Sequence, residues 1–152
     1  MRRPRDPLAR RLRALAPFVH CTRHELDLVA RNLTEHRAAA GDVLVEEGRS
    51  GRELIVIVEG EATVSRHGRA VARLGPGDVV GEVALLDHGP RTATVVADTP
   101  VLALVCTARE FTTLVECVPG FVRSLLPGLA RCIRAADADL VAGQGGASAA
   151  VR

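Results

Sequence analysis

The stretch from Gly75 to Val96 reads GPGDVVGEVALLDHGPRTATVV and decides both the predicted fold and the predicted site. Its middle contains a short apolar run, Val83 to Leu86, with room for one helical turn between two strands. The start of such a turn exposes free backbone N–H groups, which suit an anion. Arg91 follows nine residues after Glu82, where its planar guanidinium can bind the same anion.

Glu82 and Thr92 complete a candidate pocket for a sugar that carries a phosphate. A carboxylate accepts hydrogen bonds, so Glu82 suits a sugar hydroxyl, whereas the Thr92 hydroxyl can donate beside Arg91. Each residue also has an ordinary structural explanation. Glu82 and Arg91 can form an ion pair across the loop, Gly81 can be a turn glycine, and the apolar run can belong to the core. These residues, taken singly, leave both explanations open.

Short apolar or alternating runs, separated by turn residues, surround this stretch. Nine of the 14 glycines lie between Gly41 and Gly89. Short strands that recur regularly between such turn residues predict a β-sandwich or a jelly-roll barrel. The predicted strands are Asp42–Val45, Glu53–Val58, Ala62–Ser65, Ala70–Leu74, Thr92–Ala97 and Val101–Val105.

Residues 1–17 form an Arg-rich arm or helix ahead of the barrel. Six Arg fall in the first 13 residues, and Leu8, Leu12 and Leu15 recur at helical spacing. We expect a short amphipathic helix docked on the domain or a solvated arm. Contact with an acidic partner or with nucleic acid is the alternative.

Two capping boxes mark the starts of further helices. In each, a Thr hydroxyl accepts a hydrogen bond from the amide three residues later, and a Glu side chain reaches back. The predicted helices are 23–33, which Thr22 and Glu25 open, and 108–117, which Thr107 and Glu110 open.

The C-terminal stretch, residues 121–141, is apolar along one broad stripe but contains Pro127. Proline is poorly tolerated inside a helix and is accepted at its first position. We therefore expect a short helix over 121–125, a kink, a last helix over about 127–141, and a flexible tail over 142–152.

Composition argues against several classes of protein. A membrane helix needs about twenty consecutive apolar residues, and no apolar run in this sequence approaches that length. All 20 basic residues are Arg, yet the net charge is +2 and Trp and Tyr are absent, which disfavours strong polyanion binding and base-stacking platforms. The sequence lacks His-x-His and Gly-x-Ser-x-Gly motifs, which disfavours a cupin-like metalloenzyme or a serine hydrolase. We expect no enzyme activity, no metal and no cofactor.

The four cysteines, Cys21, Cys106, Cys117 and Cys132, form no Cys-x-x-Cys pair. No secretion signal precedes them. Reduced thiols in a cytoplasmic protein are therefore favoured over a disulfide framework or a zinc site.

Several motifs together resemble one family. Gly81-Glu-Val-Ala-Leu-Leu, the eight residues between Glu82 and Arg91, and Pro90-Arg-Thr-Ala-Thr-Val resemble the phosphate-binding cassette of cyclic-nucleotide-binding domains. That family includes the catabolite activator protein, the regulatory subunits of cyclic-nucleotide-dependent kinases and cyclic-nucleotide-gated channels. The resemblance extends over about residues 18–140, although Val80 replaces the usual aromatic residue before Gly-Glu.

The resemblance implies a mainly β fold, a jelly-roll barrel (double-stranded β-helix) with an N-terminal helix and C-terminal lid helices. It implies one domain of a stand-alone bacterial type over residues 18–141. Within it, the barrel would span about 38–106 and the C-terminal helices 107–141.

The resemblance also implies a role for each site residue. Glu82 would bind the ribose 2′-hydroxyl, Arg91 would neutralise the cyclic phosphate, and Gly81 would let the backbone approach the ribose. Thr92 would lie near the base, and the resemblance leaves the preference between cAMP and cGMP open. The implied contact set is Gly81, Glu82, Val83, Ala84, Leu85, Arg91, Thr92 and Ala93, with amides around Ala84 and Leu85 donating to the phosphate. The lid candidates are Arg131, Ile133 and Arg134.

A cyclic-nucleotide sensor without its own output domain is therefore the expected function. Binding of cAMP or cGMP would move the C-terminal helices and signal to an unknown protein partner or through a homodimer. Specific DNA binding is not expected, since no helix-turn-helix pattern follows the last helix. The alternative is a protein-docking module that keeps the fold without binding nucleotide, against which the intact Glu82–Arg91 pair argues.

Overall fold

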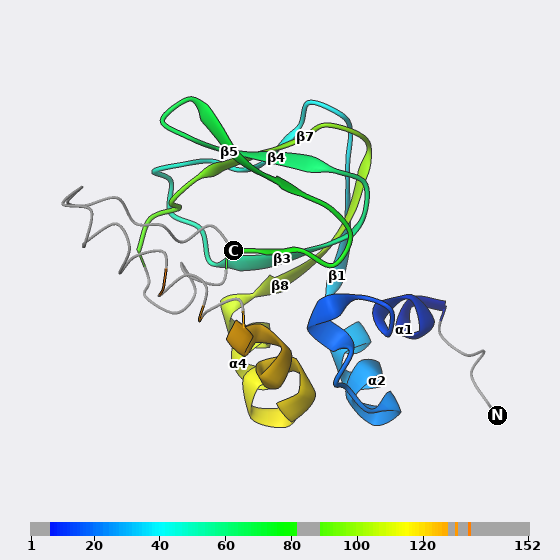
Figure 1. Cartoon of the computed structure of the whole chain (residues 1–152). Coiled ribbons are helices and arrows are strands. Elements are labelled where there is room, and N and C mark those ends of the chain that lie inside the picture. The colour runs from blue at the N-terminus through cyan, green and yellow to red at the C-terminus, as the bar shows by residue number, and fades with distance from the viewer. Residues whose placement is uncertain (1–6, 82–88, 128–129, 131–133, 135–152) are drawn as a thin grey trace.

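Eight short strands form two antiparallel sheets of four strands each in the part of the chain that the structure describes. This computed structural model describes residues 7–81, 89–127, 130 and 134. The first sheet has the order β1-β8-β3-β6 and the second β2-β7-β4-β5, and the two close around one interior (Figure 1). The strands are β1 (Thr34–Ala38), β2 (Val43–Val45), β3 (Glu53–Glu59), β4 (Ala62–Arg66), β5 (Arg69–Leu74), β6 (Val79–Val80), β7 (Thr94–Ala97) and β8 (Val101–Thr107).

The central strands of the first sheet are apolar on both faces because both faces are covered. Leu54 and Val56 of β3 point toward the helices, whereas Ile55 and Ile57 point into the barrel and pack with residues of the second sheet. Five consecutive positions of β3 are buried. A continuous apolar run of this kind is what a strand buried on both sides requires.

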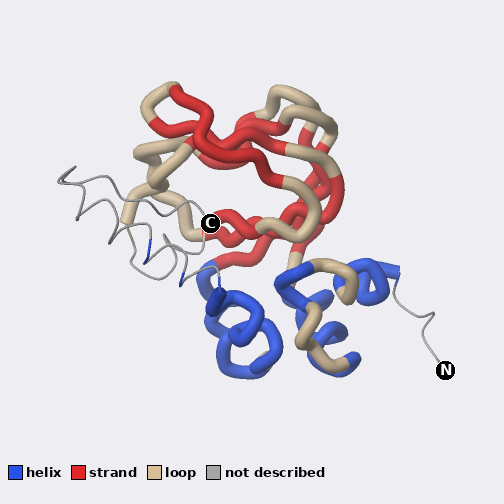
Figure 2. Tube along the Cα trace, in the orientation of Figure 1, coloured by secondary structure: helices blue, strands red, loops and turns tan. Residues whose placement is uncertain are grey.

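The helices gather on the outer face of the first sheet, as Figure 2 shows. They are α1 (Pro7–Leu12), the short 3₁₀ helix η1 (Ala16–Phe18), α2 (Arg23–Asn32) and α4 (Ala108–Cys117), and residues 119–127 are also helical. Leu12, Phe18 and Phe121 are almost fully buried in the core between these helices and the sheet. None of the helices among the described residues is long and apolar enough to cross a membrane.

Most predicted elements are confirmed, since two four-stranded sheets with flanking helices make the predicted mainly β fold. Both capping boxes form, and the helices that they open are α2 and α4. The Leu residues of the N-terminal arm do mark a docked helix, although α1 is only six residues long.

Two strands and one helix start differ from the prediction. Strand β1, which precedes the expected start of the barrel near residue 38, was not predicted, because four of its five side chains are exposed and show no apolar alternation. The two-residue strand β6 was not predicted either. The helix expected to start at residue 121 starts at 119, with Pro119 at its first position, where proline is tolerated. The helix runs without a break from 119 through Pro127, so the expected end at residue 125 and the new helix start at about 127 are wrong. The tail and, apart from residues 130 and 134, the rest of the predicted last helix lie outside the described residues.

Candidate functional site

Arg91 lies three residues before the start of β7 and is held by the loop between β2 and β3. Its amide donates to the Arg49 carbonyl at 2.9 Å, and its carbonyl accepts from the Gly48 amide at 2.8 Å. Its side chain turns inward, so that the residue is only 8% exposed. It is the one buried charged residue in the part of the chain that the structure describes.

Two glycines make room for the Arg91 guanidinium. A Cβ atom added to Gly51 would collide with Arg91 Nε, and one added to Gly81 would collide with Arg91 Nη1 and lie 2.5 Å from the Glu53 carbonyl oxygen. Gly81 has a φ of +95°, which L side chains rarely adopt. The guanidinium therefore occupies space that any larger residue at these two positions would take.

The Arg91 guanidinium is only partly paired. Nη2 donates to the Glu53 carbonyl oxygen at 2.8 Å, whereas Nη1 is buried with no hydrogen-bond partner within the described ranges. Burial lowers the pKa of the Arg91 guanidinium, and the charge of Glu53 acts in the opposite direction. A buried cation with an unused donor is suited to an anion that supplies both charge and an acceptor.

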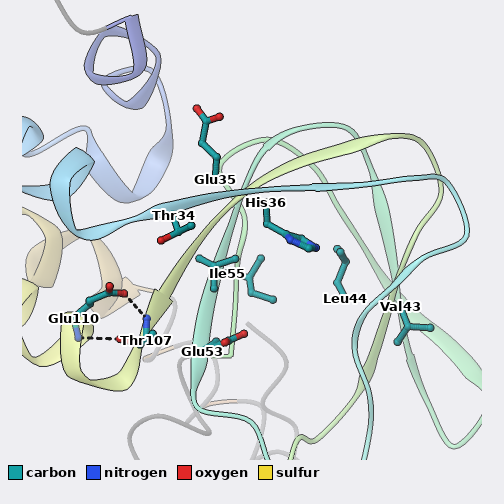
Figure 3. Close-up of a pocket in the computed structure, with 10 residues that line it drawn as sticks. Thr34, Glu35, His36, Val43, Leu44, Glu53, Ile55, Thr107 and Glu110 are labelled. Carbon is teal, nitrogen blue, oxygen red and sulfur yellow. Dashed lines mark hydrogen bonds between the residues drawn. The ribbon is translucent and has the colours of Figure 1, made fainter.

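Of two neighbouring cavities, only one is lined by this arginine. The smaller, of about 300 Å³, is lined by the β2–β3 loop, Glu53 and Arg91. The larger, of about 430 Å³, shares Val43, Leu44 and Glu53 with it and extends toward β1 and α4 (Figure 3).

The larger cavity has an apolar wall and an acidic lining. Ile55 of β3 lines it, while Thr34 and His36 come from β1 (Figure 3). Its lining includes Glu35, Glu53 and Glu110 but no arginine. Because Arg91 carries a positive charge and the larger cavity is lined by carboxylates, an anion is favoured at Arg91 and not in the larger cavity.

The chain is similar to known proteins in sequence and in fold. The family model described as cyclic nucleotide-binding domain matches residues 35–116, more than half of the chain. The chain belongs to the cyclic nucleotide-binding domain family.

Three relatives of this cyclic nucleotide-binding domain are longer than the chain itself. Acetyltransferase Pat of Mycolicibacterium smegmatis is 36% identical over 120 residues, which cover 76% of this chain and 35% of that protein. The solved structure of the Thermus thermophilus catabolite activator protein has a TM-score of 0.76 and 28% identity, covering 85% of this chain and 63% of that one. The regulatory domain of Toxoplasma gondii PKA, solved with cAMP, has a TM-score of 0.62 and 32% identity, and the match covers 70% of this chain and 42% of that one. The chain thus spans less than two thirds of each relative, and the fold of the two solved structures confirms the predicted jelly-roll barrel.

The structure places four of the eight predicted site residues of this cyclic nucleotide-binding domain. Gly81 lies against Arg91, and the Thr92 carbonyl accepts a hydrogen bond from Arg66 Nε at 3.2 Å. Ala93 is buried in the barrel interior. The other four, Glu82, Val83, Ala84 and Leu85, lie outside the described residues, as do the lid candidates Arg131 and Ile133. Arg134, the third lid candidate, is helical and exposed.

Gly51 and Glu53 belong to the arginine's surroundings and were not predicted from the sequence. Both lie about forty positions before Arg91 in the chain. Gly51 lies against the guanidinium in a turn, and Glu53 accepts a hydrogen bond from it through the backbone carbonyl group. A carbonyl contact leaves no signature in the residue type. The glycine in Arg-Ser-Gly-Arg was the only available signal, and an ordinary turn explains it equally well.

Proposed function

We propose that this domain binds a cyclic purine nucleotide, cAMP or cGMP, with its phosphate at Arg91, and that it acts as a regulatory sensor. The observation that carries the proposal is the buried Arg91 guanidinium, whose Nη1 lacks a partner among the described residues. A cyclic phosphate has one negative charge and two free oxygens. It would therefore supply both the countercharge and the missing acceptor.

The predicted contacts of the neighbouring residues are part of this proposal. The backbone at Gly81 would approach the ribose, Glu82 would accept from its 2′-hydroxyl, and amides around Ala84 and Leu85 would donate to the phosphate. Thr92 would lie near the base, with cAMP and cGMP both open. The structure of the Toxoplasma relative with cAMP supports the choice of ligand class.

The response to binding would pass through the C-terminal helices. The helix at 119–127 begins in the core between the other helices, since Phe121 is almost fully buried there. A nucleotide that favours one position of the helices following it would shift the population of two conformations. The shifted helices would then contact a protein partner or a second copy of the chain.

Calorimetric titration of the wild-type chain with cAMP, cGMP and 5′-AMP tests this function. Calorimetry is suitable because the chain has neither Trp nor Tyr as a fluorescent reporter. We expect heat from at least one cyclic nucleotide below millimolar concentration. We expect weaker binding of 5′-AMP, because its phosphate is a dianion and is not closed into a ring with the ribose. No heat from either cyclic nucleotide with folded protein would instead favour a docking module that keeps the fold alone.

A further inference from the structure

The start of the helix at 119–127 contacts the segment before α2 at two points and the first turn of α2 at a third. The rings of Phe18 and Phe121 stack with centroids 5.8 Å apart and planes inclined by 14°. The Gly120 backbone lies so close to His20 that an added Cβ would be 2.5 Å from the His20 carbonyl oxygen. The Gly120 amide donates to Glu25 Oε1 at 3.1 Å.

The Glu25 carboxylate accepts hydrogen bonds at the starts of two helices. Oε2 accepts from the Thr22 amide at 2.6 Å within the capping box of α2, and Oε1 accepts from Gly120, 95 residues further along the chain. These backbone hydrogen bonds, from Thr22 first and Gly120 second, lower the pKa of the Glu25 carboxyl, and the charge of Arg123 acts in the same direction. A carboxylate near the first turn of both helices is also favoured by their dipoles.

Glu110 shows that the second contact is not needed for capping. It forms the same capping box in α4, where Oε2 accepts from the Thr107 amide at 2.8 Å. Within the described ranges, Glu110 accepts no hydrogen bond from a second helix. The bond from Gly120 to Glu25 is therefore an additional connection between the two ends of the chain.

We propose that Glu25 is a positioning residue that couples the C-terminal helix to α1 and α2, so that a movement of that helix reaches the N-terminal surface. The inference rests on the proposed function, in which nucleotide binding displaces the C-terminal helices. The coupling extends to α1 because Leu12 and Leu15 lie in the same buried cluster as Phe18 and Phe121. The N-terminal helices thus become a second place where the nucleotide state can be read.

Glu25→Gln and Glu110→Gln are a matched pair of variants. A carboxylate accepts from two amides through its two oxygens, whereas the glutamine side chain has one oxygen and one NH₂ group. Glutamine also satisfies a capping box. Glu25→Gln can therefore keep only one of its two hydrogen bonds, while Glu110→Gln can keep the single one described.

Amide hydrogen exchange, measured residue by residue by NMR with and without saturating cAMP or cGMP, tests the coupling. In the wild type and in Glu110→Gln, nucleotide should change exchange both at 119–127 and at 7–32. In Glu25→Gln, nucleotide should still bind and change exchange at 119–127, while the change at 7–32 should fall at least about twofold. An undiminished change at 7–32 in Glu25→Gln would overturn the coupling.

A second variant and an unliganded measurement keep the test independent of the proposed function. Gly120→Ala should reproduce Glu25→Gln, since its methyl group would force Gly120 away from His20. If the wild type binds no cyclic nucleotide, the proposed function fails, and exchange without ligand then decides the coupling. Glu25→Gln should speed exchange of the Gly120 amide at least about tenfold relative to Glu110→Gln, and equal rates would refute the coupling.

Discussion

Arg91 concentrates the chemistry of this domain at one residue. Arg91 is only 8% exposed and has lost most of its hydration, and among the described residues its side chain donates one hydrogen bond, to the Glu53 carbonyl oxygen. A buried charged group without full pairing is costly unless a ligand completes its environment. The proposed nucleotide phosphate would complete the environment of this residue.

Gly51→Ala tests whether space around Arg91 matters for binding. The added methyl group would collide with Arg91 Nε and displace the guanidinium, so we expect nucleotide affinity to fall about tenfold, which corresponds to about 1.4 kcal/mol. Gly75→Ala is the control, because an added Cβ there meets nothing within 4 Å and neither glycine has a positive φ. Calorimetric titration with cAMP or cGMP measures both. Wild-type affinity in folded Gly51→Ala would show that the packing around Arg91 is not limiting.

At the residue scale, the sequence predicted the arginine but not its surroundings. Arg91 and Gly81 are recognisable because they belong to one contiguous motif. Gly51 and the Glu53 carbonyl reach Arg91 only after the β2–β3 loop has folded against it. Contacts of this kind depend on tertiary structure, so the residue pattern near Arg91 carries no trace of them.

At the scale of elements, local signals were reliable where they were self-contained. The two capping boxes predicted the starts of α2 and α4 because each involves residues only three apart. β1 escaped prediction because its sequence, TEHRA, has one buried residue and pairs with β8 some seventy positions away. A strand held mainly by ladder hydrogen bonds has no apolar alternation to detect.

The capping carboxylates give a prediction for stability and its pH dependence. Glu25→Gln should lower the free energy of unfolding by about 1 kcal/mol, because one partly exposed amide loses its carboxylate partner, whereas Glu110→Gln should cost less than about 0.5 kcal/mol. Urea unfolding followed by far-UV circular dichroism measures both at pH 7.

Acidification should reduce the difference between wild type and Glu25→Gln. The pKa of Glu25 is lowered in the folded state, so the stabilisation is complete above the unfolded pKa of about 4.3 and is lost as the pH falls through the folded pKa. Arg123 and Cys21 also interact electrostatically with this carboxylate. The difference should therefore be constant from about pH 7 to 5 and smaller near pH 3. A difference that persists unchanged at pH 3 would assign it to packing and not to charge.

On the scale of the whole molecule, the buried thiol of Cys106 reports unfolding. Cys106 lies in central strand β8 with no exposed surface, and burial raises the pKa of its thiol to about 12. Because Cys106 packs in the core between the helices and the first sheet, its alkylation at pH 8 requires that core to unfold. Nucleotide at about 100 times its dissociation constant should slow this alkylation about 100-fold, equivalent to about 2.7 kcal/mol. The rate at exposed Cys117, followed in the same samples by peptide mass spectrometry, should stay unchanged; equal slowing at both thiols would indicate an effect on the reagent.

The pairing of Arg91 with the nucleotide phosphate is tested most directly by comparing two arginine variants in one calorimetric titration with cAMP and cGMP. Arg91→Ala removes the buried guanidinium, whereas Arg49→Ala removes an exposed one from the same cavity, where it pairs only with Glu46 among the described residues. We predict that Arg91→Ala weakens binding by about 30-fold or more and that Arg49→Ala changes it less than about threefold. Wild-type affinity in folded Arg91→Ala would contradict the assignment of Arg91 to the phosphate.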